Sequence, residues 1–470
     1  MAMNVNRPNI LWICTDQQRY DTISALNNSQ LNTPNIDALV ASGVAFERAY
    51  CQSPICTPSR ASFLTGMYPS SVHACGNGNE HWSEAAPLVT ALLADAGYDC
   101  ALAGKLHLAG AYGRIEPRPT HDGYRLFHWS HDPEDQWEAG HAYADWLTSL
   151  GHNLGEMRQH PHDIPPELHQ TTWCAERAIE FMEADHGGKP WLMSVNIFDP
   201  HEPFDPPQQY LDRFDADSLS GPKFRDSDLE SQARLARIDF QHPPRRPEAF
   251  KAKCIQAAYY AMIELIDDNV GRMMESLERS GQRDNTIVIF MSDHGEALGD
   301  HGLLLKGCRF YEGLVRVPLI ISWPGAFLEG ARREALVELL DIAPTLLELA
   351  GQPIPKRMQG LSLRRLLVDA EAGDHQRDAV RCEYYSAINP NFDATYSGTY
   401  ATMIRDERYK LVVYHGHDYG ELFDLEADPD EFDNLWDDPA MMATKLDLMR
   451  RSFDALALAT DTGAEQITWF

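Results

Sequence analysis

Several short, strongly apolar runs limit most severely the folds open to this chain. They occupy residues 9–14, 99–103, 191–198 and 286–292. Runs of this length are typical of strands buried on both faces of a parallel sheet. Helical patterns at residues 34–41, 88–96, 171–184 and 250–280 separate them. The alternation predicts an α/β fold with a doubly wound, mostly parallel sheet flanked by helices.

Chemically useful side chains follow these runs at their carboxyl ends. They are Asp16 and Gln17, Lys105 and His107, His201, and Asp293 with His294. Because the carboxyl ends of parallel strands meet at one edge of a sheet, we expect these side chains to share a crevice. An isolated Asp at a strand end is more often a helix cap, so the prediction depends on the joint placement.

The pattern changes after about residue 370. Short strand-like segments at 400–405, 409–414 and 421–425 precede a helical segment at 439–458. This order favours a small antiparallel α+β domain. We therefore expect a catalytic α/β domain over residues 1–370 and a C-terminal subdomain over residues 371–470.

Two stretches interrupt the alternation. Residues 111–169 are rich in His, Trp, Pro and Asp, and residues 211–247 are polar and charged. The histidines lack the tight pairing of metal ligands, so an insertion that shapes the substrate site is the better interpretation than a second metal site. The second stretch is typical of an excursion or lid.

The charge balance restricts the partners. The chain has 470 residues and a formal net charge of −30. Nucleic acids and anionic membranes need an excess of Lys and Arg at the contact, so neither is an expected partner. An anionic substrate would be repelled by the overall field and would need a local basic pocket.

The N-terminal residues and the spacing of the cysteines predict the localisation. Residues 1–7 contain no apolar signal core, and no run is long enough to span a membrane. Nine cysteines without framework spacing suit reduced thiols. We expect a cytoplasmic protein, with the periplasm as the alternative if a signal peptide has been removed.

The segment Cys56-Thr57-Pro58-Ser59-Arg60 carries the strongest chemical signal. Thr57 is a plausible N-cap and Pro58 suits the first helical position, which would place Cys56 just outside a helix N-terminus. Unpaired N–H groups there favour negative charge, so the position suits a nucleophile that handles an anion. The plain alternative is a small buried cysteine.

This C-x-P-S-R run, followed by Leu64-Thr65-Gly66, resembles the signature of the type I sulfatases of the alkaline phosphatase superfamily. In that family a formylglycine-generating enzyme oxidises the cysteine to formylglycine. The resemblance covers about residues 1–440 and is strongest at 9–18, 51–69, 104–107 and 291–307. It implies an alkaline phosphatase-like fold.

The resemblance also implies a divalent metal. Its expected ligands are Asp16, Gln17, Cys56, Asp293 and His294. Oxygen-rich donors favour Ca²⁺ and leave Mg²⁺ possible, and Mn²⁺ stays open because His294 is a softer ligand. Gln17 and His294 stand where many members have Asp and Asn; both substitutions recur in choline sulfatases and phosphonate monoester hydrolases.

Catalytic roles follow from the same resemblance. Arg60 would orient the aldehyde hydrate, Lys105 and Lys306 would hold the sulfate oxygens, and His201 would protonate the leaving oxygen. His107 would assist collapse of the hemiacetal, and Asn77 and Asn79 would contact substrate. One hydroxyl of the hydrate attacks sulfur and expels the alcohol, and the other then expels sulfate.

Three functions are compatible with these residues. The first is metal-dependent hydrolysis of sulfate monoesters, arylsulfatase-like, with a small aryl or alkyl sulfate as substrate. The second is a phosphonate monoester or phosphodiester hydrolase, which the charged Lys105 and His107 disfavour because the phosphonate hydrolases carry uncharged residues there. The third is a non-catalytic, metal-binding scaffold. The aromatic tail at 468–470 suggests a homo-oligomer.

Overall fold

The computed structural model describes residues 7–111, 114–133, 140–388, 398–460 and 468–469. Its centre is an eight-stranded sheet in the order β10-β2-β9-β7-β1-β6-β4-β5. The strands are β1 (Asn9–Thr15), β2 (Val44–Phe46), β4 (Asp99–Gly104), β5 (Tyr124–Trp129), β6 (Trp191–Asn196), β7 (Thr286–Ser292), β9 (Leu319–Ser322) and β10 (Ala331–Arg333). Only β9 runs antiparallel to its neighbours, so the predicted mostly parallel sheet is confirmed.

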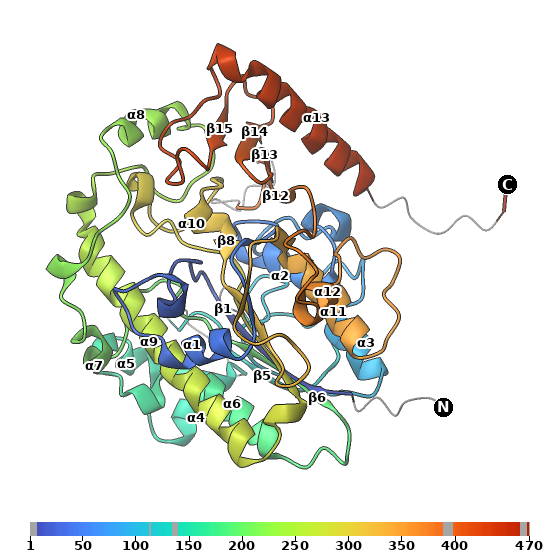
Figure 1. Ribbon diagram of the computed structural model, residues 1–470. Helices are drawn as coiled ribbons and strands as arrows, with labels where there is room; N and C mark the ends of the chain where they lie inside the picture. The colour runs from blue at the N-terminus through green and yellow to red at the C-terminus, as the bar shows by residue number, and fades with distance from the viewer. Residues whose placement is uncertain (1–6, 112–113, 134–139, 389–397, 461–467, 470) are drawn as a thin grey trace.

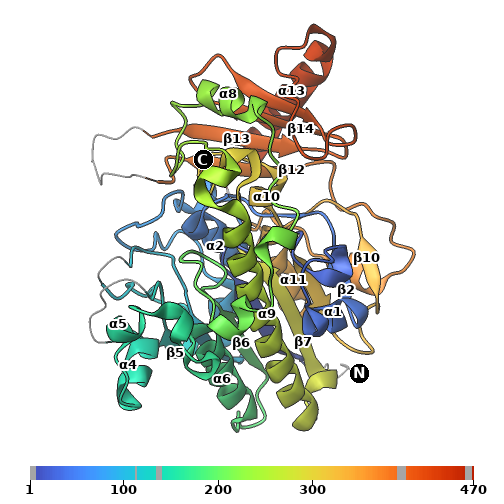
Figure 2. The same ribbon diagram turned by 90° about the vertical axis from the view of Figure 1, so that its left-hand side faces the viewer.

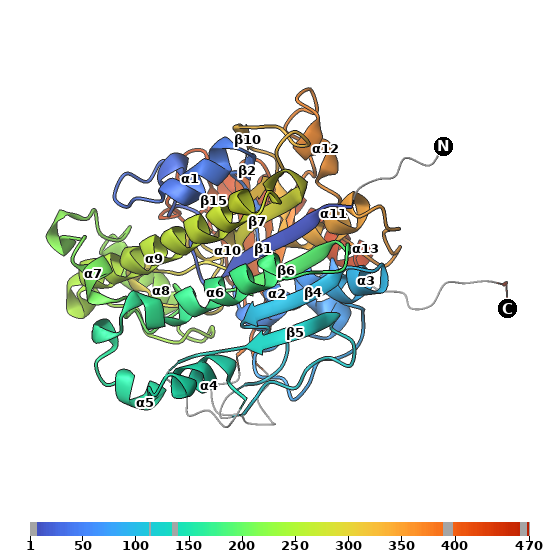
Figure 3. The same ribbon diagram turned by 90° about the horizontal axis from the view of Figure 1, so that it is seen from below.

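Helices cover both faces of this sheet (Figures 1 and 3). One face packs against α1 (Pro34–Ala41), α6 (Gln170–Glu183) and α9 (Ala252–Arg279), and the other against α2 (Cys56–Thr65), α3 (Val89–Asp95) and α11 (Ile342–Leu349). Within β1, Leu11 and Ile13 pack in the core beneath α1, α6 and α9, whereas Ile10 and Trp12 pack in the core on the opposite face. Successive strand residues point to opposite faces, so a sheet covered twice needs a continuously apolar strand.

The C-terminal part contains a four-stranded antiparallel sheet, as expected (Figure 2). It comprises β12 (Val380–Tyr385), β13 (Tyr400–Arg405), β14 (Tyr409–Tyr414) and β15 (Gly420–Asp424), with α13 (Met442–Leu458) against it. Strand β12 was not predicted. It contacts the small sheet of β3 (Ala49–Tyr50), β8 (Arg316–Val317) and β11 (Val337–Glu338). The domain boundary near residue 370 stays a prediction.

The two irregular stretches hold more structure than the sequence indicated. Residues 111–169 contribute the edge strand β5 and the helices α4 (Ala142–Ser149) and α5 (Leu154–Met157). Residues flanking the second stretch form α7 (Gln208–Leu211), and α8 (Ser227–Arg234) lies within it. The remaining helices are α10 (Glu312–Val315) and α12 (Arg364–Val368). In the described ranges, none of the helices combines the length and the apolar character that a membrane crossing requires.

Candidate active site

The strand ends converge as the pattern predicted. Thr15 of β1 pairs with Ser292 of β7, so Asp16 and Asp293 leave the sheet side by side. One ligand atom each of Asp16, Cys56, Asp293 and His294 lies within 4.8 Å of the others, and all four residues are buried. In the described part of the chain no second group of this kind is found.

Cys56 is the first residue of α2 and not the residue before it. The N-cap is Ile55, which has no side-chain cap bond, so the expected capping by Thr57 is wrong. The amide Oδ1 of Asn77 instead accepts the backbone N–H of Thr57 at 2.9 Å. Pro58 is therefore the third helical residue and not the first, and it is tolerated there because the N–H groups of the first turn have no helical acceptor.

Arg60 organises the two carboxylates. Its Nε donates to Asp293 at 2.8 Å, and a terminal nitrogen donates to Asp16 at 3.0 Å. The other terminal nitrogen donates to the carbonyl oxygen of Lys105 at 2.8 Å. The guanidinium is fully buried, and such a planar fork fixes both carboxylates at once. Its predicted contact with the aldehyde hydrate stays a prediction.

Lys105 reaches the centre from the end of β4. Its Nζ lies 2.6 Å from Asp16 and 3.7 Å from the sulfur of Cys56. Gly104 has φ +111°, and a Cβ there would lie 1.9 Å from the carbonyl oxygen of Asn196. Only glycine lets β4 approach β6 so closely. Burial acts to raise the pKa of Asp16, but Lys105 and then His201 hold that pKa well below its usual value.

His294 completes the cluster. Its Nδ1 lies 2.8 Å from the carbonyl of Gly295, and its Nε2 lies 3.1 Å from the Cys56 sulfur. Burial lowers its pKa, but Asp293 and Cys56 outweigh burial and raise the pKa of His294 to about 10. The two carboxylates, the imidazole and a donor atom of residue 56 form a set of ligands that fits a divalent metal.

Lys306 and His201 form the outer side of the centre. The Nζ of Lys306 lies 2.6 Å from His201 Nε2 and also donates to the side-chain oxygen of Gln17. Gln17 Nε2 donates to Glu202 at 2.9 Å and to Glu296, so this amide lies among charged groups. Its backbone N–H donates to Asp293 at 3.0 Å. Gln17 is therefore adjacent to the cluster, and its role as ligand stays a prediction.

The charges on this side reinforce one another. Burial acts to raise the pKa of Glu202, but His201 and Lys306 lower that pKa to about 2. Burial acts to lower the pKa of His201, but Glu202 outweighs it and raises that pKa. Lys306 is thus a buried cation in contact with His201, and its charge acts on Cys56. Together with Lys105 it supplies the local positive charge that an acidic protein needs to capture an anion.

His107 follows Lys105 in a left-handed conformation, with φ +58°. Its ring meets the ring of His131 edge-on, with centroids 4.7 Å apart. Burial, followed by the charge of Lys105, lowers the pKa of His107 well below its usual value. A neutral imidazole can accept a proton, which suits the predicted role. Asn79 offers its carbonyl oxygen to Gly110 N at 2.6 Å, and its contact with substrate stays a prediction.

Sequence reasoning missed several residues of this centre. Glu202 could have been noticed, because it is charged and follows His201 directly. Glu296 is fully buried and accepts the backbone N–H of Leu298 at 2.9 Å, and Glu116 accepts that of His107 at 2.7 Å. No spacing in the sequence indicates these bonds, since the donors are main-chain groups.

Comparison with known proteins identifies what this arrangement resembles. The chain matches the family model described as Sulfatase over residues 8–352 and that described as N-sulphoglucosamine sulphohydrolase, C-terminal, over residues 299–456. It is 31% identical over 454 residues to an arylsulfatase of Clostridium perfringens, covering 91% of this chain and 90% of that protein.

Two further relatives are close. A choline-sulfatase of Rhizobium meliloti is 31% identical over 456 residues, covering 93% of this chain and 84% of that protein. The crystal structure of a phosphonate monoester hydrolase of Agrobacterium radiobacter has a TM-score of 0.82 and 27% identity, covering 97% of this chain and 96% of that chain. The relatives thus include enzymes named for sulfate esters and for phosphonate esters.

Proposed function

The chain belongs to the sulfatase family and is a sulfuric ester hydrolase, and on that premise we propose that it cleaves small sulfate monoesters through a formylglycine formed at Cys56. One observation carries the proposal. Lys105 Nζ lies 3.7 Å from the Cys56 sulfur, and Lys306, in contact with His201, is a second cation whose charge acts on Cys56. A transition state that gathers negative charge on sulfate oxygens gains most from such fixed cations.

The proposed metal is Ca²⁺, held by Asp16, Asp293, His294 and the modified residue 56, with Gln17 as a further ligand. A divalent cation there supplies Lewis acidity and neutralises oxyanions. Arg60 contributes by fixing both carboxylates, at 2.8 Å and 3.0 Å, through one oxygen of each, and both carboxylates would hold the cation. EDTA should lower kcat at least about tenfold, and Ca²⁺ should restore it. Restoration by Mn²⁺ alone would correct the metal assignment.

The remaining roles belong to this chain's own side chains. A formylglycine hydrate supplies a nucleophilic hydroxyl and a second hydroxyl from which the ester can be released. Lys105 and Lys306 bind the sulfate oxygens, and His201 donates a hydrogen bond to the leaving oxygen. His107 is neutral and removes the proton of the second hydroxyl. A formylglycine-generating enzyme is the required partner during maturation.

A phosphonate monoester or phosphodiester hydrolase is the second candidate, favoured by the fold similarity to the Agrobacterium enzyme and by Gln17 and His294. Lys105, a fixed cation 3.7 Å from the Cys56 sulfur, favours sulfate. Material co-expressed with the maturation enzyme should be assayed on 4-nitrophenyl sulfate, 4-nitrophenyl phenylphosphonate and bis(4-nitrophenyl) phosphate. We expect kcat/KM to be highest for the sulfate; a higher value for either phosphorus ester would assign the second function.

Two measurements complete the test. Mass spectrometry of the peptide holding Cys56 should show conversion of the thiol to the aldehyde, and turnover by fully unconverted protein would refute the formylglycine. Absence of turnover with converted, metal-loaded protein would leave the scaffold interpretation. Sulfated saccharides should react more slowly than 4-nitrophenyl sulfate, because no basic groove is indicated by the sequence. Reaction of saccharides alone would overturn the proposed substrate class.

A further inference from the structure

One buried carboxylate accepts hydrogen bonds from the main-chain N–H groups of the loop that contains His107. Glu116 accepts the backbone N–H of His107 at 2.7 Å, of Leu108 at 2.5 Å and of Ala109 at 3.1 Å. It also accepts the indole N–H of Trp129 at 3.0 Å. Glu116 is 2% exposed, so these four bonds form away from water.

The backbone of His107 explains why such an acceptor is needed. A φ of +58° is uncommon for a residue with a side chain, because its Cβ crowds the backbone. It interrupts the extended course that follows β4 and directs consecutive N–H groups toward one point. Buried N–H groups without an acceptor cost free energy, so the carboxylate of Glu116 stabilises this conformation against alternatives.

The two ends of the loop are held by different parts of the molecule. The carbonyl oxygen of Lys105 accepts from Arg60 at 2.8 Å and from Asn196 at 2.9 Å, which fixes the lysine to the sheet and to α2. The segment from His107 onward is held instead through Glu116. The edge strand β5 ends at Trp129, whose indole N–H donates to the same oxygen of Glu116 that accepts the N–H of His107.

The ring of His107 has little else to orient it. Its Nδ1 is buried and has no hydrogen-bond partner among the described residues. Its contact with the ring of His131 is edge-on, at 4.7 Å between centroids. The direction in which the imidazole points is therefore set by its main chain. A displacement of about 1 Å in a catalytic group can reduce the rate about a hundredfold.

We propose that Glu116 is a positioning residue of this active centre: its carboxylate holds the left-handed loop 107–109 and thereby aims His107 at residue 56. The inference rests on the proposed function for its catalytic consequence only. The edge strand β5 acquires a role as well, because Trp129 anchors the carboxylate. The stretch after residue 111 thus stabilises the loop 107–109 through Glu116 and Trp129.

A double-mutant cycle tests the link to His107. Glu116→Gln replaces one acceptor oxygen with a donor that opposes a main-chain N–H, and we expect kcat on 4-nitrophenyl sulfate to fall about 10- to 100-fold with KM changed less than about threefold. His107→Ala alone should lower kcat about 100-fold or more. If Glu116 acts through His107, adding Glu116→Gln to His107→Ala should change kcat less than about threefold. Multiplicative effects would overturn the proposal.

Hydrogen exchange supplies a readout independent of activity. Deuterium uptake in a peptide spanning residues 104–111 should rise in Glu116→Gln. Glu383→Gln is the matched control, because Glu383 is also 2% exposed and accepts a backbone N–H, that of Ser70 at 2.7 Å. The control should leave uptake in 104–111 unchanged. Equal uptake in wild type and Glu116→Gln would overturn the proposal, whether or not the enzyme hydrolyses sulfate.

A second variant guards against loss of folding. Trp129→Phe keeps a ring in place but removes the indole donor to Glu116. It should lower kcat about threefold to tenfold, raise exchange in 104–111 less than Glu116→Gln does, and lose its effect on kcat when His107 is Ala. Full activity together with wild-type exchange in Trp129→Phe would contradict the anchoring by β5. Lack of sulfate hydrolysis by wild type would refute the proposed function and leave the exchange result to decide on the loop.

Discussion

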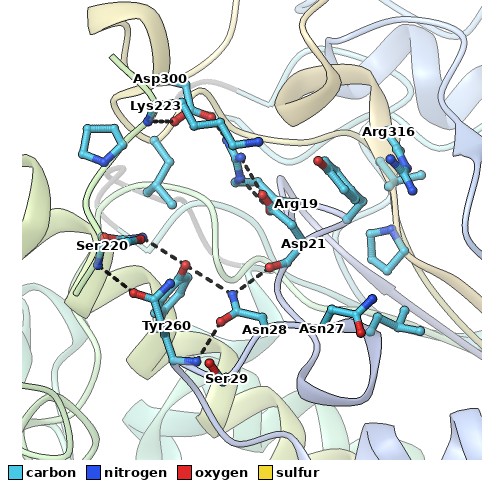
Figure 4. Close-up of a pocket in the computed structure, with 18 of the residues that line it drawn as sticks. Arg19, Asp21, Asn27, Asn28, Ser29, Ser220, Lys223, Tyr260, Asp300 and Arg316 are labelled. Carbon is cyan, nitrogen blue, oxygen red and sulfur yellow. Dashed lines mark hydrogen bonds and ion pairs between the residues drawn. The ribbon is translucent and has the colours of Figure 1, made fainter. Parts of the chain in front are cut away.

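The Cys56 centre and the cavity beside Arg19 lie on either side of the turn that follows β1, yet their charges are arranged differently. The cavity has a volume of about 760 Å³ and is lined by cationic and acidic residues (Figure 4). There Arg19 pairs with Asp21 at 2.8 Å and with Asp300 at 2.9 Å. Lys223 pairs with Asp430 at 2.8 Å.

In the Cys56 centre, by contrast, cations and carboxylates face one reactive position. Burial and then Asp16 act to raise the pKa of the Cys56 thiol, but Lys105 and Lys306 lower it, and Arg60 pairs with both carboxylates. The difference shows that cavity volume does not locate the chemistry of this protein. Opposite charges that pair with each other stabilise the lining of a cavity, whereas charges that face one atom change its reactivity.

The largest expected effect comes from removing the reactive position itself. Cys56→Ser offers a single hydroxyl in place of the aldehyde hydrate, so kcat should fall at least about 10³-fold. A serine that accepts sulfate should retain it, which mass spectrometry detects as a gain of about 80 Da on this peptide. The exposed Cys254→Ser is the control and should keep full activity. Multiple turnovers by Cys56→Ser would refute the proposed reaction.

The second effect tests whether the convergent cations matter. Lys306→Ala should lower kcat on 4-nitrophenyl sulfate about 10²- to 10³-fold, because one fixed cation facing the sulfate oxygens is lost. Steady-state kinetics at saturating substrate measure it. A drop below about threefold would remove the distinction between this centre and the cavity beside Arg19.

The third prediction concerns the acidity of the unconverted thiol in metal-free protein. Burial and then Asp16 act to raise the pKa of Cys56, but Lys105, Lys306 and His294 outweigh them and lower that pKa to about 5. The thiolate should therefore persist at neutral pH and disappear as the pH falls through about 5. Absorbance at about 240 nm, corrected with Cys56→Ser, follows it. Lys306→Ala should move the midpoint upward; a midpoint near 9 in wild type would contradict the convergence of charge.

The smallest effect is expected in the cavity beside Arg19. Lys223 is partly exposed and paired with Asp430, so Lys223→Gln removes a pair worth at most about 1 kcal/mol. We expect kcat to stay within about twofold and the melting temperature to shift by a few degrees at most. A tenfold loss of activity would show that this cavity takes part in catalysis.

Much of the fold was predictable because its signals are local. The apolar run over β1 and the period of α9 indicate a buried strand and an amphipathic helix without knowledge of any partner. Strand β5 was missed because its four central residues are partly or fully exposed, as suits an edge position. Strand β12 was missed because its burial depends on contact with β3 and β11.

The candidate site was predictable only in part, for a related reason. Asp16, Lys105, His201 and Asp293 follow strands, so their approach to one edge follows from parallel topology. The capping of Thr57 by Asn77 and the partners of Gln17 involve side chains distant in sequence. Such bonds leave no periodic trace in the chain.

The sequence by itself thus determined which groups reach the centre: the cysteine motif, the carboxylates and the basic residues at strand ends. Only the tertiary structure decided which hydrogen-bond and ion-pair partners each group has. It paired Arg60 with both carboxylates of the centre and Arg19 with Asp21 and Asp300 in the neighbouring cavity. It also brought the main-chain N–H groups of His107 to Ala109 to the carboxylate of Glu116. The physical reason is that periodicity depends on near neighbours, whereas the balance of buried charges and hydrogen bonds depends on which distant segments meet.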